Sequence, residues 1–309
     1  MDYVRHCISC GCEDQIMLIK GTEPTGFGEK SFCFVQCPEC GLIFLSPRPL
    51  EETIQDYYQP DYHPFSMAIE DDPYWVSCLL RRYDQYKRYR AVARHARKPG
   101  KILDIGCSTG IFLHSMQHHG WITYGVEPSA FAANYAVQRF GLNVMQMVLE
   151  EAKFDSNFFD VVSLWDVFEH IYDPSHTLAE IYRILKPGGL LLLNLPNPES
   201  WERKWFGPSW AGWDIPRHIY LFPLRSLDRL LGNANLQRID VYSFTGRHGA
   251  LILSLEEWLK KKQWHEWQKR WVLRIAGSLL SRALTYPFYN IANWLNKSSY
   301  MAVYARKME

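Results

Sequence analysis

One stretch, residues 101 to 110 (KILDIGCSTG), constrains the fold more than any other part of the chain. The apolar residues Ile102, Leu103 and Ile105 predict a buried strand, and Gly106 and Gly110 bracket a tight turn after it. Apolar residues follow at once, which indicates that a helix begins there. Such a unit presents backbone N–H groups at a helix N-terminus, where a polar or anionic ligand is favoured. The sequence therefore predicts a ligand site at this turn.

The chain beyond this turn alternates between apolar strands and helices. Further strands are expected at 121–126, 142–146, 160–164, 190–195, 238–244 and 301–305, and helices at 129–139 and about 174–185. A helical insertion at about 249–297 separates the last two strands. Strands and helices at this spacing predict an α/β fold with a doubly wound, mostly parallel sheet that binds ligands at the carboxyl ends of its strands.

The N-terminal region carries two CxxCG motifs, at 7–11 and 37–41. Two residues between thiolates let one turn direct both sulfurs at one ion, and two such motifs complete a tetrahedral zinc site. Because four cysteines leave no open coordination position, we expect this zinc to stabilise the fold and not to catalyse. A ribbon that has lost its metal and a disulfide set are the alternatives, and Cys12 or Cys33 can replace a motif cysteine. The predicted ligands are Cys7, Cys10, Cys37 and Cys40.

Composition narrows the class of protein. The formal net charge is +1 and the ribbon motifs lie among acidic residues, which argues against a nucleic-acid partner. The N-terminus lacks the apolar segment of a secretory signal and no apolar run is long enough to span a bilayer, so we expect a cytoplasmic protein.

The predicted domains are the ribbon at 1–48, a helical lid or linker at 49–98 and the α/β domain at 99–309.

Three ligand classes compete for the glycine turn. Ser108 stands between the two glycines, which departs from the G-x-G-x-x-G pattern of dinucleotide sites, and the Lys-Ser/Thr of a P-loop is missing after Gly110. The third class fits, because LDIGCSTG resembles motif I of the class I S-adenosylmethionine-dependent methyltransferases. The resemblance covers roughly 99–245 and continues through VEPS, FDVVSLWDVFEHIYDP, EIYRILKPGGLLLLNLPN and HIYLFPLRSLDRLL, in that order. An N-terminal zinc ribbon also occurs in some members of that family.

The resemblance implies a seven-stranded Rossmann-like fold, S-adenosylmethionine as methyl donor and a set of cofactor-binding residues. Glu127, at the end of the second strand, is expected to accept hydrogen bonds from both ribose hydroxyls. The turn would lie against the amino-acid and ribose portion, with Asp104 bound to water, loop N–H groups or the cofactor ammonium. Leu149, Glu150 and Glu151 are the alternatives for the residue that contacts the adenine. Of the three, Leu149 is included in the predicted set of cofactor-binding residues. The implied cofactor-binding residues are Asp104, Gly106, Cys107, Ser108, Gly110, Glu127, Leu149 and Trp165.

Methyl transfer from a sulfonium requires a closely held nucleophile, exclusion of water and, for some acceptors, a base. The candidate bases are His170, Asp166, Glu169 and His218. Imidazole titrates near neutral pH, which suits this role. The alternative for Glu169 and His170 is a structural pair that holds the loop. The acceptor is expected to be a small molecule or a glycan, methylated on oxygen in preference to carbon or nitrogen.

The segment 255–279 carries a tryptophan stripe beside lysines and arginines. Packing against the domain, a homodimer interface and contact with a membrane surface all remain open for it. A helix is also predicted at 74–98, and we interpret its basic face as a solvated surface. Anion binding is the alternative interpretation of that face. Two other functions also remain for the whole chain, which are a catalytically silent S-adenosylmethionine-binding protein and a zinc-ribbon adaptor.

Overall fold

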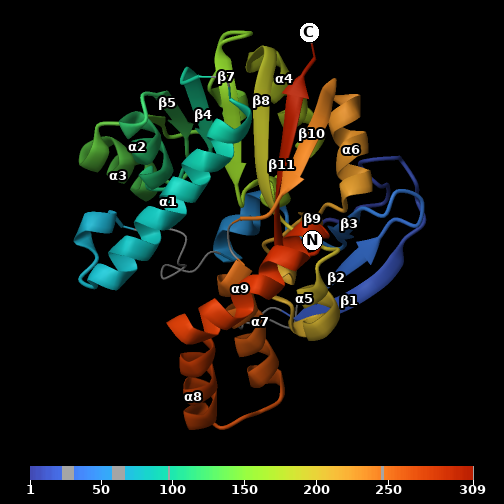
Figure 1. The fold of residues 1–309 in the computed structure, drawn as a ribbon. Helices are drawn as coiled ribbons and strands as arrows, with labels where there is room; N and C mark the ends of the chain where they lie inside the picture. Colours follow the sequence, from blue (N-terminus) through green and yellow to red (C-terminus); the bar gives the residue numbers. More distant parts are fainter. Residues whose placement is uncertain (23–30, 58–66, 97, 245–246, 309) are drawn as a thin grey trace. The chain divides into compact units, whose positions relative to one another are not determined.

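The computed structural model describes residues 1–22, 31–57, 67–96, 98–244 and 247–308 (Figure 1). The chain forms two compact units, each assembled from three segments. The first unit comprises Met1–Tyr57, Leu195–Leu227 and Val241–Ala302, and the second comprises Tyr58–Asn194, Asp228–Asp240 and Val303–Glu309. Residues 1–48 lie in the first unit together with segments from later in the chain.

The second unit is built on a seven-stranded sheet with the order β10-β11-β8-β7-β4-β5-β6. The strands β8, β7, β4, β5 and β6 run parallel to one another. In chain order the strands are β4 (Lys101–Ile105), β5 (Ile122–Val126), β6 (Asn143–Met145), β7 (Phe159–Trp165), β8 (Leu185–Pro196), β10 (Leu236–Tyr242) and β11 (Tyr300–Lys307). This order and direction confirm the predicted doubly wound, mostly parallel α/β fold.

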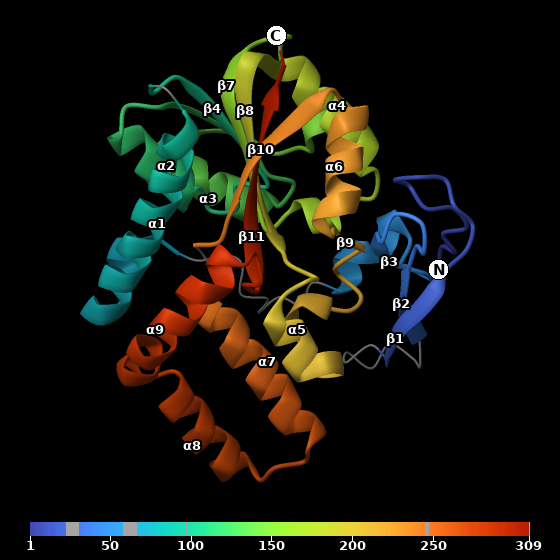
Figure 2. The same cartoon turned by 45° about the vertical axis from the view of Figure 1, so that its right-hand side comes forward.

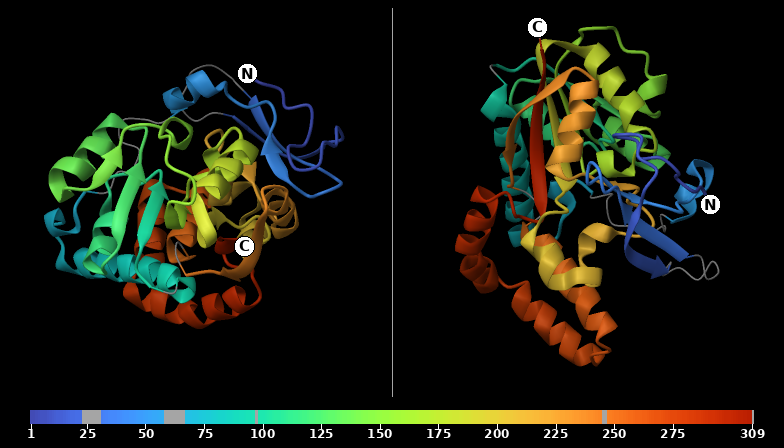
Figure 3. Two further views of the ribbon diagram at one scale, coloured as in Figure 1. Left: turned by 90° about the horizontal axis from the view of Figure 1, so that it is seen from above. Right: turned by 90° about the vertical axis from the view of Figure 1, so that its right-hand side faces the viewer.

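Helices lie on both faces of this sheet (Figures 2 and 3). They are α1 (Trp75–His95), α2 (Ile111–His118), α3 (Ala130–Phe140), α4 (Pro174–Ile184) and α6 (Leu224–Asn233), with short 3-10 turns η2 (Ile69–Asp71), η3 (Leu149–Glu151) and η4 (Phe168–His170). Residue Ser129 caps α3 by accepting from the Ala132 N–H, and Asp173 caps α4 by accepting from the His176 N–H. The core strands are nearly fully buried, so their apolar runs predicted them well.

The strand expected at 190–195 begins earlier in the structure, since Lys186–Gly189 already belongs to β8, which begins at Leu185. The helix predicted at 74–98 is confirmed as α1, which buries Ala91 and Val92 and leaves Leu79 and Tyr83 exposed. Part of the expected lid at 49–98, residues 58–66, lies outside the described residues.

The first unit contains a four-stranded sheet with the order β1-β2-β3-β9. Its strands are β1 (Ile16–Thr22), β2 (Ser31–Gln36), β3 (Ile43–Leu45) and β9 (Tyr220–Leu221), followed along the chain from β3 by η1 (Glu51–Tyr57). The short strand β9 pairs antiparallel with β3, so a segment far along the chain completes the ribbon sheet. The shared core consists of Phe32, Phe34, Ile43, Leu45, Tyr57, Trp210, Trp213 and Leu221.

The remaining part of the first unit is helical. The segment 197–220 holds α5 (Trp201–Phe206), η5 (Gly207–Ser209) and η6 (Ala211–Trp213). The predicted insertion between the last two strands forms α7 (Arg247–Lys261), α8 (Glu266–Ala276) and α9 (Leu279–Trp294). Within the part of the chain that is described, none of the helices combines the length and the apolar character needed to cross a membrane.

Candidate functional site

The turn after β4 requires its glycines. Gly106 has a φ of +68°, and a Cβ added there would lie 2.6 Å from a γ-carbon of Val167. Gly110 has a φ of +78°, and a Cβ there would lie 2.4 Å from a δ-carbon of Leu142. The N–H of Gly106 donates to the Val126 carbonyl over 2.8 Å, which draws the turn against the end of β5. Both glycines are therefore needed for the backbone conformation and for space.

Glu127 lies directly after β5 and is held by the same turn. Its Oε2 accepts from the Ser108 N–H and its Oε1 accepts from the Ser129 N–H, both over 2.9 Å. Burial raises the pKa of this carboxyl, while the two N–H donors lower it. Each carboxylate oxygen has two lone pairs, so each retains one acceptor position after these bonds. The arrangement fits the paired hydroxyls of a ribose.

Ser108, which stands between the two glycines of the turn, adopts a φ of 50° in the left-handed region. This conformation turns its N–H toward Glu127. The neighbouring Cys107 is buried against Gly125, where an added Cβ would approach its sulfur to 2.6 Å. These two residues thus shape the turn through backbone and packing.

Asp104 lies at the carboxyl end of β4 and is 2% exposed. Its Oδ1 accepts a hydrogen bond of 2.7 Å from the Ser163 hydroxyl on β7. Burial raises the pKa of Asp104 to about 7, against the lowering effects of Ser163 and of the Arg88 charge, and the Glu127 charge raises it further. A buried carboxyl that titrates near neutral pH is the kind of group that functional sites collect.

Trp165, the last residue of β7, is enclosed by two side chains of its own unit. The Phe112 ring meets it edge-on at 5.2 Å between centroids, and the Arg88 guanidinium lies 4.8 Å from its ring centroid. Arg88 belongs to the basic face of α1, for which a solvated surface was favoured from the sequence. The structure instead places this arginine over an aromatic ring at the carboxyl end of the sheet.

The three alternatives for the adenine contact lie together in η3, after β6. Leu149 is 2% exposed at the start of η3. The carboxylate of Glu150 accepts a 2.7 Å hydrogen bond from the Thr177 hydroxyl of α4, so it serves to fix η3. Glu151 is exposed. The retained residue, Leu149, is the buried apolar member of the three.

The four candidate bases divide between the units. Asp166, with a φ of 59°, accepts a 2.6 Å bond from the Asn194 amide, and Glu169 is nearly fully buried in η4. His170 ends η4 and is half-buried. His218 belongs to the first unit, where its Nδ1 lies 2.9 Å from the Gly212 carbonyl oxygen and its Nε2 lies 3.7 Å from Asp214. Their catalytic role stays a prediction.

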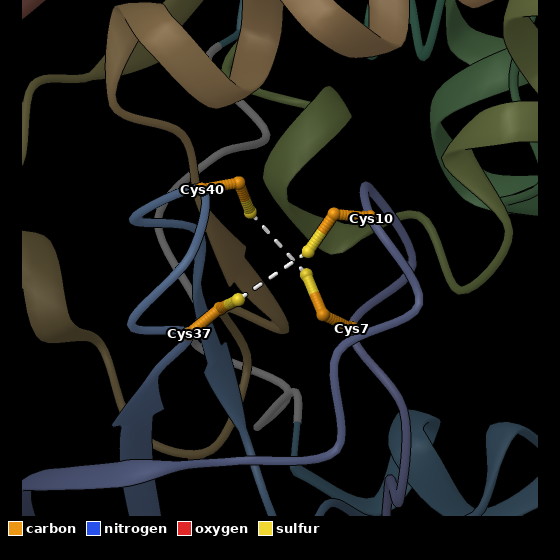
Figure 4. Close-up of side chains that lie close together, drawn as sticks. All are labelled: Cys7, Cys10, Cys37 and Cys40. Carbon is orange, nitrogen blue, oxygen red and sulfur yellow. Dashed lines mark hydrogen bonds between the residues drawn. The ribbon is translucent and has the colours of Figure 1, made fainter.

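The four motif cysteines converge in the first unit (Figure 4). The sulfurs of Cys7 and Cys40 are 3.4 Å apart, as are those of Cys10 and Cys37. All four sulfurs lie within 4.8 Å of one another. A tetrahedron with Zn–S bonds of ~2.3 Å has S···S edges of roughly 3.8 Å, so this cluster fits a zinc ion.

The two motifs have the same local geometry. In each, the glycine after the second cysteine donates its N–H to the carbonyl of the first, over 2.7 Å for Gly11 and 3.0 Å for Gly41. Both glycines have positive φ angles, of 76° and 82°. The glycine of the CxxCG pattern is therefore explained by the left-handed backbone that closes each turn.

Comparison with known proteins identifies the family. A family model described as "Methyltransferase domain" matches residues 80–241, which is more than half of the chain. The chain belongs to the class I S-adenosylmethionine-dependent methyltransferases. It is thus a member of a family of methyl-transferring enzymes, and S-adenosylmethionine is the methyl donor of that family.

Relatives of this methyltransferase include ubiquinone biosynthesis O-methyltransferases. The protein from Sodalis glossinidius (strain morsitans) is 30% identical over 124 residues, which cover 38% of this chain and 50% of the relative. The protein from Cronobacter sakazakii (strain ATCC BAA-894) is 33% identical over 109 residues, covering 33% of this chain and 45% of the relative. The chain thus spans about half the length of these relatives.

A solved structure supports the fold. A crystal structure assigned as a sarcosine dimethylglycine methyltransferase from Galdieria sulphuraria superposes with a TM-score of 0.50 at 14% identity, covering 84% of this chain and 99% of that one. Together with the strand order, this likeness confirms the Rossmann-like fold of the methyltransferase.

Sequence reasoning missed three partners at the carboxyl edge of the sheet of this methyltransferase. They are Arg88 over Trp165, Ser163 on Asp104 and Asn194 on Asp166. A signal existed for two of them, because Ser163 interrupts the apolar run of β7 and Asn194 that of β8. Arg88 carried no such signal, since it is one of many basic residues on α1.

Proposed function

We propose that this methyltransferase transfers the methyl group of S-adenosylmethionine to an oxygen of a small-molecule acceptor. The observation that carries the proposal is the double anchoring of Glu127 by the N–H groups of Ser108 and Ser129 beside the glycine turn. When bound, S-adenosylmethionine would supply an electrophilic methyl group on a sulfonium. The cofactor-binding residues would be those predicted from the sequence, with Glu127 holding the ribose hydroxyls and Asp104 near the ammonium.

O-methylation is favoured by the relatives, which are ubiquinone biosynthesis O-methyltransferases at 30–33% identity. A glycan acceptor and methylation of carbon or nitrogen are the alternatives. Removal of the acceptor proton is assigned to His170, whose half-buried imidazole ends η4 at the carboxyl edge of the sheet. Asp166, Glu169 and His218 are the alternative bases, and the Asn194 amide fixes the carboxylate of Asp166.

We also propose that Cys7, Cys10, Cys37 and Cys40 hold one structural zinc ion. The support is the mutual approach of the four sulfurs and the matching geometry of the two turns. Since four thiolates would complete the coordination, the ion would have no position for a substrate. Its role would be to stabilise the ribbon sheet of the first unit.

The decisive experiment for the donor site is calorimetric titration of S-adenosylmethionine into wild-type protein and Glu127→Ala. Loss of charge-assisted hydrogen bonds worth about 1.5–3 kcal/mol should weaken the affinity by roughly tenfold to a hundredfold. Asp155→Ala, which removes an exposed acid of the same unit, should leave it unchanged. Equal affinity in wild type and Glu127→Ala would remove the basis of the assignment.

Turnover separates an enzyme from a silent binding protein. The measurement is release of S-adenosylhomocysteine with phenols, amines and free sugars offered in parallel. Release with the phenols alone is expected for an O-methyltransferase of small molecules, and His170→Gln should reduce kcat while leaving the affinity for S-adenosylmethionine intact. Tight binding without release from any acceptor would favour the silent binding protein.

A further inference from the structure

The helices α8 and α9 leave a large apolar surface uncovered. The helix α8 has no buried residue, and α9 buries only Tyr289 and Ala292 among its described side chains. In α8, Trp267, Trp271 and Ile275 are 63%, 58% and 65% exposed. Their spacing of four residues places them along one stripe of the helix. The expectation that this segment packs against the domain is therefore not met by these three side chains.

The helix α9 continues this surface. Its exposed side chains include Leu280, Leu284, Ile291 and Trp294, which fall on the face opposite Tyr289. The inner face is anchored within the first unit, because the Tyr289 hydroxyl donates to a carboxylate oxygen of Glu202 over 2.9 Å. Figures 1 and 2 show α8 and α9 as consecutive helices that follow α7, and α8 packs against both. An anchored inner face and an exposed apolar outer face indicate an interaction surface for another molecule.

The charge on these two helices is positive. The helices α8 and α9 carry one lysine, three arginines and one glutamate, whereas the whole chain has a formal net charge of +1. On α8, Arg270 and Arg274 flank the tryptophan stripe and are exposed. Arg274 lies 5.9 Å from the Trp271 ring centroid, so cation and indole share one edge of the helix.

We propose that α8 and α9 form a docking surface for an anionic lipid bilayer. Exposed tryptophan and leucine would enter the boundary between headgroups and acyl chains, while arginine and lysine side chains extend to the lipid phosphates. A second copy of the chain is a poorer occupant, because a two-fold axis would bring the same positive segment against itself. The negative charge of the bilayer complements the segment instead.

The test is flotation of the full-length chain with vesicles of phosphatidylcholine alone and of equimolar phosphatidylcholine and phosphatidylglycerol. The chain should float with the anionic vesicles, remain in the buffer with the neutral ones, and detach as salt is raised. The double substitution Trp267→Ser/Trp271→Ser should reduce the vesicle-bound to free ratio by about tenfold or more. Arg270→Gln/Arg274→Gln should reduce binding to anionic vesicles in the same way.

The matched control is Trp75→Ser, which removes a tryptophan that is 77% exposed in α1 of the second unit and should leave flotation unchanged. Leu284→Ser provides an independent test on α9, and an unchanged thermal midpoint shows that each variant is folded. Failure of the wild type to float with anionic vesicles would overturn the proposal. So would equal losses for Trp75→Ser, or a dimer in sedimentation that Trp267→Ser/Trp271→Ser dissociates.

Discussion

At the scale of single residues, two causes require glycine in the turn after β4. One is the left-handed backbone conformation, the other is the lack of room for a Cβ, and their effects on stability can be measured separately. Gly106 and Gly141 have nearly the same φ, +68° and +65°, but an added Cβ meets Val167 only at Gly106, and nothing within 4 Å at Gly141. Left-handed backbone costs an alanine roughly 1–2 kcal/mol at either position. The steric contact adds to this cost at the turn alone.

We therefore expect Gly106→Ala to lower the free energy of unfolding by at least about 1 kcal/mol more than Gly141→Ala does. Chemical denaturation of both variants measures the difference. In addition, Gly106→Ala should weaken the binding of S-adenosylmethionine, while Gly141→Ala should not. Equal losses of stability would mean that Val167 yields at little cost and that backbone conformation alone selects this glycine.

Asp104 predicts a pH dependence of stability. Burial raises its pKa to about 7 in the folded chain, above the ordinary value of an aspartate, so the folded state holds the proton more tightly than the unfolded state does. Its contribution to stability is therefore fully present below about pH 4 and is lost as the pH rises through about 7. Between about pH 5 and about pH 8 the loss should be roughly 3 kcal/mol.

Asp104→Asn removes this titration and keeps an oxygen that accepts from the Ser163 hydroxyl. The free energy of unfolding of the wild type should thus fall relative to the variant as the pH rises across this range. Urea denaturation at both ends of the range measures it. Parallel profiles for the two proteins would show that Asp104 ionises at its ordinary pKa despite its burial.

At the scale of elements, the cysteine turns and the ribbon sheet should lose stability together when the metal is removed. The turns at Cys7 and Cys37 flank β1 and β2, and these strands enclose a core that includes Trp210 and Trp213. We expect one zinc ion per chain by elemental analysis, its loss in Cys10→Ser, and a lower thermal midpoint after chelation. Cys78→Ser is the control, because this half-buried thiol belongs to the second unit and is not part of the four-cysteine cluster. Full stability in a metal-free chain would contradict a structural role for zinc.

The elements also show how far the sequence could be read. The strands of the parallel sheet were predicted closely because they are buried on both faces and so appear as continuous apolar runs. The pairing of β3 with β9 was not predictable, since two residues of backbone hydrogen bonding leave no pattern. The exposure of the outer face of α9 was not predictable either. Apolar periodicity indicates that a helix has an apolar face, but it does not indicate whether another element covers that face.

The same limit applies to the candidate site. Gly106, Gly110 and Glu127 could be named because the backbone and the strand ends dictate these residue types at fixed spacing. Arg88 could not, because its contact with Trp165 joins two elements far apart along the chain. Side-chain partners across a sheet edge depend on packing, which single-sequence patterns do not encode.

At the scale of the whole molecule, four of the five points at which the chain crosses between its two units lie inside continuous elements. The boundaries at 194–195, 227–228, 240–241 and 302–303 fall inside β8, α6, β10 and β11. Loss of the first unit would therefore release the ends of three strands of the seven-stranded sheet. We expect the chain to unfold in one calorimetric transition, despite its two compact units.

That single transition should respond to ligands of either unit. At about 100 times its dissociation constant, S-adenosylmethionine should stabilise the chain by about 2.7 kcal/mol, and Cys10→Ser should lower the midpoint of the same transition. Differential scanning calorimetry with and without the cofactor measures both effects, and Cys78→Ser again serves as the control. Two resolved transitions, one moved only by S-adenosylmethionine and the other only by the cysteine substitution, would show that the shared strands do not couple the units.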